Sequence, residues 1–182
     1  MTTTSTVARP TKLAHLVIRT ARYDEMVEWW CNLLGAHVVH GDDGISFLTY
    51  DDEHHRLAII RNETVGDEAR SNAGLEHVAF TYDGIDDLVS TYERLRDQGI
   101  HPILPINHGM TVSLYYQDPD ANQAELQVDV LSPAESAEFM ATDTFEANPI
   151  GVVFDPEEMA AQHRAGVPVD ALSAYGPTAE SK

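Results

Sequence analysis

The fold of this sequence is decided by two similar stretches, KLAHLVIRTARYDEMVEWWCNLLGAHVV at 12–39 and GLEHVAFTYDGIDDLVSTYERLRDQGIHPI at 74–103. Self-similarity of this kind is the signature of a repeated structural unit. Each stretch predicts a strand, a turn, an amphipathic helix that ends near a glycine, and a second strand. The chain therefore contains one structural unit twice.

Local signals support both predictions. Apolar residues occupy both faces of the expected strand at 13–18, which suits a strand that is covered on two sides. Asp24 and Asp86 are expected to cap the two helices, because a carboxylate can accept hydrogen bonds from free N–H groups and meets the positive end of the dipole. Gly35 and Gly99 suit the left-handed residue that closes each helix.

Further strands complete each copy and are separated by the turn-forming segments DDEH and DPDAN. They are ISFLTY and HRLAIIR in the first copy, and TVSLYY and AELQVDV in the second. The unit is therefore βαβββ, and the fold class is α+β with two tandem modules. We expect five segments, namely an N-terminal arm at 1–11, module 1 at 12–61, a linker at 62–73, module 2 at 74–130 and a C-terminal extension at 131–182.

The extension carries two helix signatures. SPAESAEFM and DPEEMAAQHRAG each begin with a Ser or Asp cap, which is followed by Pro at the first helical position and by early acidic residues. They predict two short helices. NPIGVVF, which lies between them, is expected to be a docked extended segment.

Composition limits the partners and the compartment. Thirty acidic residues against eleven basic ones give a formal net charge of -19, which repels nucleic acid and anionic membranes and also suits a salty habitat. Cys31 is the only cysteine, which excludes an internal disulfide. Neither a signal peptide nor an apolar run of roughly 20 residues is present. We expect a soluble cytoplasmic protein, and a homo-oligomer because exposed sheet edges often pair.

Three side chains in the repeat indicate metal chemistry. His15 and His77 occupy the same point in the two copies, and a pseudo-twofold arrangement would bring them together. With Glu125, on the last strand of the second copy, they would form the set of two imidazoles and one carboxylate that binds Fe(II) and leaves positions open. A lone strand histidine is more often a packing or surface residue. Glu125, between Gln123 and Gln127, also suits a solvated strand face.

The doubled βαβββ unit with LAHLVI, LEHVAF and YYQDPDANQAELQ resembles the vicinal oxygen chelate superfamily. Its members include glyoxalase I, fosfomycin-resistance proteins, bleomycin-binding proteins and extradiol ring-cleaving dioxygenases. The resemblance covers about residues 12–130 and implies a vicinal oxygen chelate fold. Because this superfamily hosts many chemistries, the function has to come from the site.

The segment DDEHHRLAII at 51–60 distinguishes two branches of the superfamily. Glyoxalase-like members tend to have a second glutamate on the last strand of module 1, and HRLAII offers none, so a four-ligand glyoxalase site is disfavoured. The segment is similar to the His-His-x-Leu-Ala stretch of type I extradiol dioxygenases, in which the second histidine faces the oxygen side of the iron. That resemblance implies that His55 is the acid/base residue.

The resemblance implies two more site residues in module 2. Type I enzymes have a tyrosine ten residues before the ligand glutamate, which corresponds to Tyr115, although a packed aromatic is the other interpretation of this position. Tyr116 points to the opposite face of the strand. Family members also have a histidine in the preceding loop, for which INHGMTV offers His108. The remaining histidines are interpreted as ordinary surface or packing residues: His54, His37, His40, His101 and His163. If His54 and His55 both lie in the strand, alternation turns His54 away from His55.

The resemblance thus implies an Fe(II)-dependent extradiol dioxygenase in which His55, Tyr115 and His108 are catalytic. Its partners would be O2 and a small aromatic diol such as catechol or 2,3-dihydroxybiphenyl, and Mn(II) suits the same ligands. The alternatives are a glyoxalase-like metal-dependent isomerase or lyase and a non-enzymatic protein that binds aromatic ligands. Many extradiol enzymes have four modules, so we expect the extension of this two-module chain to cover the cleft that the missing half leaves open.

Overall fold

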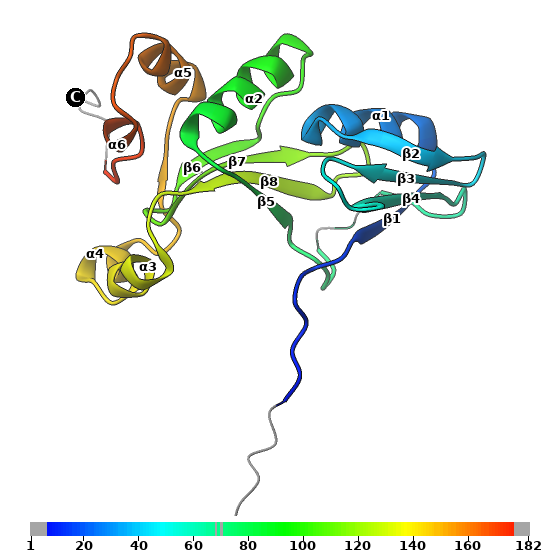
Figure 1. Ribbon diagram of the computed structural model, residues 1–182, viewed down its shortest axis with the longest axis horizontal. Coiled ribbons are helices and arrows are strands. Elements are labelled where there is room, and N and C mark those ends of the chain that lie inside the picture. The colour runs from blue at the N-terminus through cyan, green and yellow to red at the C-terminus, as the bar shows by residue number, and fades with distance from the viewer. Residues whose placement is uncertain (1–6, 68, 70, 177–182) are drawn as a thin grey trace, which may run out of the picture. The chain divides into compact units, whose positions relative to one another are not determined.

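The structure, a computed structural model, divides the chain into two compact units, Met1–Gly66 and Asp67–Lys182. Each unit has its own sheet (Figure 1). The described residues are 7–67, 69 and 71–176. The rest lie outside the described residues, namely 1–6 of the expected arm, 68 and 70 of the expected linker, and 177–182 of the expected extension.

The first unit is one βαβββ module, in which a helix packs on a four-stranded sheet (Figure 1). The sheet order is β1-β4-β3-β2, with β1 parallel to β4 and the other pairs antiparallel. Its elements are β1 Leu16–Thr20, α1 Tyr23–Leu34, β2 His37–Gly41, β3 Ile45–Thr49 and β4 Leu57–Arg61. The predicted order of strands and helix is confirmed.

The core of the first unit lies between α1 and β4. Met26, Trp30 and Leu33 recur at helical spacing and are completely buried. Leu57 and Ile59 of β4 are buried as well. The apolar stripe of α1 therefore positions the strand that follows the His-His segment.

The two helices begin differently from the prediction. Asp24 and Asp86 are not caps, because α1 follows Arg22 and α2 follows Gly84, and neither start has a side-chain capping bond. Both carboxylates lie in the first turn, where they still meet the positive end of the dipole. Gly35 closes α1 in the left-handed conformation with φ of 61°, as predicted.

The second unit repeats the module and adds one strand from the extension. Its sheet order is β5-β8-β7-β6-β9, with β5 parallel to β8. Leu88, Tyr92 and Leu95 of the helix are buried on this sheet. The module consists of β5 Val78–Tyr82, α2 Ile85–Asp97, β6 Leu104–Asn107, β7 Thr111–Gln117 and β8 Gln123–Asp129.

The extension contains more helix than the two signatures predicted. Its described part has α3 Pro133–Met140, α4 Asp143–Ala147, β9 Val152–Val153, α5 Pro156–Arg164 and α6 Val169–Leu172. The expected helices are α3 and α5, which begin at capping residues Ser132 and Asp155. The short α4 and α6 lack the Pro-acid signature and were missed. The docked extended segment is confirmed, since β9 pairs antiparallel with β6.

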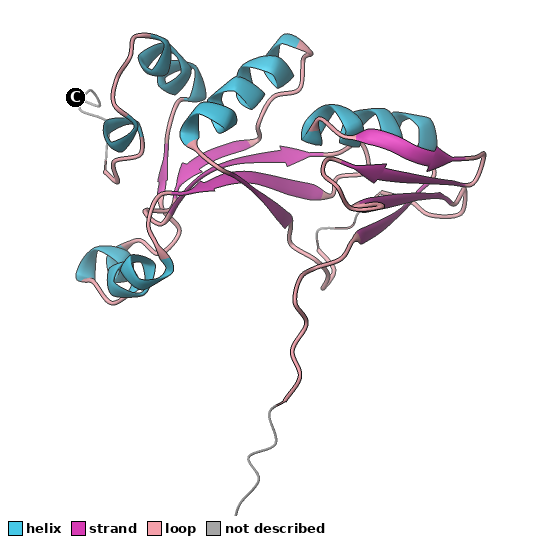
Figure 2. Ribbon diagram, in the orientation of Figure 1, coloured by secondary structure: helices cyan, strands magenta, loops and turns pink. Residues whose placement is uncertain are grey.

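The extension is anchored to the module by α5, which lies beside α2 (Figure 2). Glu157 of α5 accepts hydrogen bonds from the Tyr92 hydroxyl at 2.8 Å and from Arg96 at 3.0 Å. His163 of α5 contacts Asp86 of α2 at 2.6 Å. The second unit therefore includes the extension as part of its packing. None of the helices in the described ranges is long and apolar enough to cross a membrane.

Candidate active site

The matched histidines lie at equivalent points of the two units. His15 directly precedes β1 and His77 directly precedes β5. The sequence analysis expected both histidines within a strand, and this is wrong by one residue, since each strand begins immediately after its histidine. The strand that follows each histidine pairs in parallel with the last strand of its module, and this pairing begins at the next residue, Leu16 or Val78.

In the second unit, His77 and Glu125 form a close pair. Nε2 of His77 lies 3.0 Å from Oε2 of Glu125. Glu125 is only 4% exposed, so the alternative interpretation as a solvated strand face is wrong. Because an unpaired buried carboxylate is costly, a cationic partner is expected at this position.

Tyr115 completes this pair on the neighbouring strand. It lies directly opposite Glu125 in the β7–β8 register and is buried. The His77 ring meets the Tyr115 ring edge-on, with centroids 5.1 Å apart. Burial raises the pKa of the Tyr115 phenol well above its ordinary value, and the negative charge and hydrogen bond of Glu125 raise it further. Tyr116 lies in the core instead, completely buried.

His108 also belongs to this cluster. Its Nε2 lies 3.2 Å from the Tyr115 hydroxyl and 3.9 Å from Oε1 of Glu125. Its Nδ1 is hydrogen-bonded to the main-chain carbonyl of Ile150 in the extension. The loop histidine that the resemblance indicated is therefore placed beside Tyr115 by a segment far along the chain.

In the first unit, the rings of His15, His54 and Phe47 lie around the ring of His55. The His55 ring lies 4.5 Å from the His15 ring and 4.9 Å from the Phe47 ring, measured between centroids. Burial lowers the pKa of His55, and the charges of His54 and His15 lower it further. The interpretation of His54 as turned away from His55 is wrong. Both residues precede β4, so strand alternation does not apply, and their Nδ1 atoms lie 2.6 Å apart.

Arg56 is a site residue that sequence reasoning missed. Its guanidinium binds the Asp51 carboxylate through two nitrogens, at 2.9 and 2.8 Å. It also donates to the main-chain carbonyls of Leu13 and Ala14 at 3.2 and 3.3 Å. Arg56 thereby holds the backbone that leads into His15. The available signal was a single cation in an acidic segment, DDEHHR.

The donors present fit a divalent metal ion. Imidazole nitrogen and carboxylate oxygen are the ligands of non-haem Fe(II), and His77 and Glu125 offer one of each. Among residues 7–67, 69 and 71–176, no group of three or more His, Cys, Asp and Glu side chains gathers as a metal cluster. The addition of His15 to the pair stays a prediction, because His15 belongs to the first unit and the pair to the second.

Residues 12–126 match the model of the Glyoxalase/Bleomycin resistance protein/Dioxygenase superfamily. The chain belongs to this superfamily. A crystal structure of a domain of this superfamily from Frankia sp. EAN1pec shares the fold, with a TM-score of 0.58, 15% identity, and coverage of 71% of this chain and 99% of that one. The expected α+β fold of the superfamily is confirmed.

Two relatives within the superfamily are similar over most of the chain. Biphenyl-2,3-diol 1,2-dioxygenase 2 of Rhodococcus globerulus is 43% identical over 166 residues, which cover 90% of this chain and 87% of the relative. Biphenyl-2,3-diol 1,2-dioxygenase 3 of the same organism is 42% identical, with coverage of 89% and 87%. Such coverage exceeds residues 1–130, so the similarity includes part of the extension.

Proposed function

We propose that this superfamily member is an Fe(II)-dependent extradiol dioxygenase that opens the ring of 2,3-dihydroxybiphenyl or a similar catechol with O2. The observation that carries the proposal is the buried Glu125 with His77 and Tyr115 around it. The similarity to two enzymes named biphenyl-2,3-diol 1,2-dioxygenases supports the reaction class and the bicyclic substrate.

His15, His77 and Glu125 would hold the metal ion. A bound Fe(II) would supply a common binding point for the diol and O2 and so would align the two reactants. With two neutral imidazoles and one carboxylate, the protein contributes one negative charge and leaves room for both reactants. Mn(II) accepts the same ligands, which makes the metal a variable to be tested.

Tyr115 and His108 would orient the diol. The Tyr115 hydroxyl is 3.2 Å from His108 Nε2, and the tyrosine is buried, so a substrate hydroxyl would meet a fixed phenol rather than bulk water. A fixed polar group of this kind binds a diol in one orientation. Tyr115 and His108 therefore act as positioning partners on the diol side.

His55 would move the proton that ring opening requires. Its ring lies beside the ring of His15, the proposed metal ligand, and makes an edge contact with the ring of Phe47. Imidazole titrates near neutral pH and can both take and return a proton. The overall reaction inserts both atoms of O2 into the ring-opened product, so no external reductant is consumed.

The test is anaerobic reconstitution of the full-length protein with Fe(II), and in parallel with Mn(II) or Zn(II). 2,3-Dihydroxybiphenyl or catechol is then added, and air is admitted while oxygen and product absorbance are recorded. We expect oxygen uptake with a yellow product, and loss of at least about 100-fold in rate for His55→Ala, the lower range of acid/base catalysis. His101→Ala is the matched control, because His101 is exposed.

Three results would overturn the proposal. Turnover without oxygen uptake, or with Zn(II) alone, would indicate a glyoxalase-like isomerase or lyase. Tight binding of the diol without any metal requirement would indicate a non-enzymatic binding protein. Unchanged activity in His55→Ala would remove the assigned proton transfer.

A further inference from the structure

We propose that the C-terminal extension fixes His108 in the tautomer that carries its proton on Nδ1, so that Nε2 faces the Tyr115 hydroxyl without a proton. The role of His108 toward the diol rests on the proposed function, whereas the tautomer of His108 can be measured independently. The extension then has a positioning role at the site, in addition to its packing on α2.

The hydrogen bonds of His108 determine the tautomer. Nδ1 is bonded to the carbonyl oxygen of Ile150, which can only accept, so Nδ1 has to be the nitrogen that carries the proton. A neutral imidazole has one N–H, which leaves Nε2 without a proton. Nε2 lies 3.2 Å from the Tyr115 hydroxyl, so that its lone pair and the Glu125 carboxylate both face the one hydrogen of this hydroxyl. One main-chain carbonyl therefore decides what His108 offers to Tyr115.

Gly151 allows this carbonyl to approach. Its φ is +115°, and a Cβ built on it would lie 2.3 Å from the carbonyl oxygen of Asn107 and 2.9 Å from Cα of His108. Both neighbours are backbone atoms, which cannot rotate away as a flexible side chain does. Only glycine therefore permits the extension to pass so close to the turn that carries His108.

The segment before Gly151 is itself held in place. The Asn148 side chain donates to the Gly151 carbonyl at 2.6 Å and accepts from the Gly151 N–H at 3.2 Å. The Tyr175 hydroxyl donates to the Asn148 carbonyl at 3.3 Å. Ile150 lies inside this hydrogen-bonded loop, so its carbonyl is fixed relative to His108.

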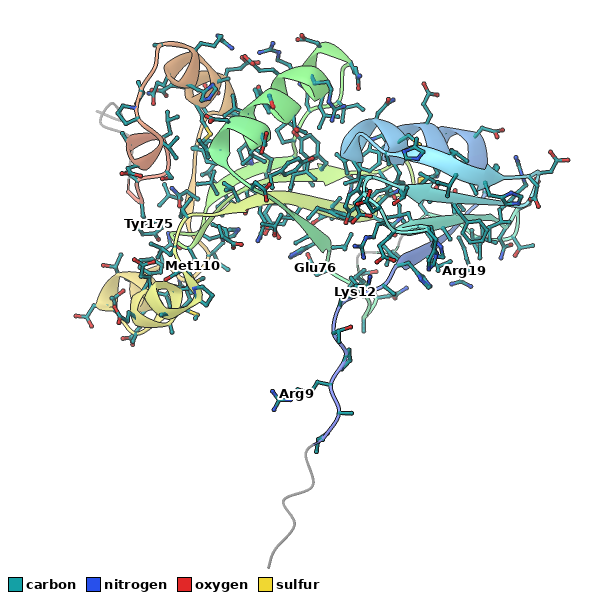
Figure 3. The ribbon with its side chains drawn as sticks, viewed as in Figure 1. Arg9, Lys12, Arg19, Glu76, Met110 and Tyr175 are labelled. Atoms are coloured by element: carbon teal, nitrogen blue, oxygen red, sulfur yellow. The ribbon has the colours of Figure 1, made fainter. Side chains whose placement is uncertain are left out.

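The extension also contacts the two neighbours of His108 in this turn. Asn107 donates to the carbonyls of Ser173 and Ala174 at 3.0 and 3.2 Å. Gly109 has φ of +85°, and its Cβ position would lie 2.4 Å from the Phe139 ring of α3. In Figure 3, Met110 and Tyr175 lie at this same end of the second sheet. Three parts of the extension thus converge on residues 107–109.

The tautomer can be read from long-range 1H–15N spectra of the full-length, metal-free protein at a pH of about 8.5, where a free imidazole is neutral. His108→Gln identifies the His108 signals by their loss. We expect a protonated Nδ1 and an unprotonated Nε2. Tyr115→Phe should leave this pattern unchanged, because the Ile150 carbonyl, and not Tyr115, sets it.

Gly151→Ala should disturb the pattern, since its Cβ forces the extension away from Asn107. Gly166→Ala is the matched control, because Gly166 also has a positive φ, +79°, but its Cβ would meet no atom within 4 Å. In the reconstituted enzyme we expect kcat/KM to fall about 10- to 100-fold for Gly151→Ala, the range for outer partners of a metal site. Gly166→Ala should keep the His108 spectrum and the activity of the parent.

The wild-type spectrum alone can overturn the inference, whether or not Gly151→Ala folds. A proton on Nε2 of His108 would do so, as would a switch of tautomer in Tyr115→Phe or an unchanged His108 pattern in a folded Gly151→Ala. If the expected tautomer is found but no diol is cleaved, the proposed function fails and the inference about the extension stands.

Discussion

Ala58 occupies in the first unit the position that Glu125 occupies in the second. The β1–β4 register pairs Val17 with Ala58, and the β5–β8 register pairs Ala79 with Glu125. Val17 and Ala79 each follow the matched histidine of their unit by two residues. The two modules therefore pair these strands in the same way but carry unequal donors, and the first offers a histidine without a carboxylate at this register. The absence of a carboxylate at Ala58 agrees with the proposed metal site of three protein ligands rather than four.

Removal of the Glu125 charge should abolish tight metal binding. Glu125→Gln keeps the shape of the side chain but loses an anionic donor, so we expect Fe(II) affinity to fall by more than about 100-fold, since outer partners alone account for 10- to 100-fold. Asp129→Asn makes the same chemical change on the same strand at an exposed position and is the control. Anaerobic calorimetry with Fe(II) measures both, and equal affinities would exclude Glu125 as a ligand.

The Asp51–Arg56 pair should make stability depend on acid pH. The hydrogen bond from Arg56 holds the pKa of the Asp51 carboxyl below its ordinary value in the folded protein. A depressed folded pKa stabilises the protein above the ordinary carboxyl pKa, and this contribution is lost as pH falls through the folded value. Asp51→Asn should therefore weaken the acid dependence of urea unfolding midpoints between pH 3 and 7. Asp52→Asn, which alters an exposed neighbour, should leave the dependence as it is.

The turn between β7 and β8 should be improved by glycine. Ala121 has φ of +72°, a left-handed conformation that disfavours a residue with a Cβ. Ala121→Gly should raise the free energy of unfolding by roughly 0.5 kcal/mol, because relief of strain outweighs the added entropy of the unfolded chain. Ala79→Gly, in the extended strand β5, should lower it by roughly 0.5–1 kcal/mol. Urea denaturation of the metal-free protein distinguishes the two signs.

Two buried tyrosines should respond oppositely to loss of their hydroxyl groups. The Tyr116 hydroxyl is buried and has no hydrogen-bond partner among the described residues, so Tyr116→Phe should be neutral or stabilising by up to about 1 kcal/mol. The Tyr92 hydroxyl donates to Glu157, so Tyr92→Phe should destabilise by about 1 kcal/mol. Thermal unfolding compares them, and a larger loss for Tyr116→Phe would contradict this assignment.

The repeated module could be predicted from sequence because its signals are local. The helical spacing of Met26, Trp30 and Leu33 is visible within one stretch of chain, and the matched histidines are visible when the two stretches are aligned. The prediction was wrong where strand alternation was applied to residues that lie outside a strand. The direction expected for His54 depended on His54 and His55 both lying in a strand, but that strand begins only at Leu57, so alternation does not apply to them.

Contacts between distant segments lay beyond sequence reasoning. His108 and Ile150 are 42 residues apart, and the contact is made by a main-chain carbonyl that any residue would supply. Arg56 reaches Leu13 across 43 residues in the same way. The signal for the first contact was Gly151, but a glycine in NPIGVVF does not reveal which backbone it approaches.

The most direct test of the account is isotope tracing of ring cleavage. Fe(II)-reconstituted protein is mixed with 2,3-dihydroxybiphenyl under 18O2, quenched before the product exchanges oxygen with water, and analysed by mass spectrometry. The account predicts one O2 consumed for each ring opened and two labelled oxygen atoms in each product molecule. A product without label, or conversion of the diol without oxygen consumption, would contradict it.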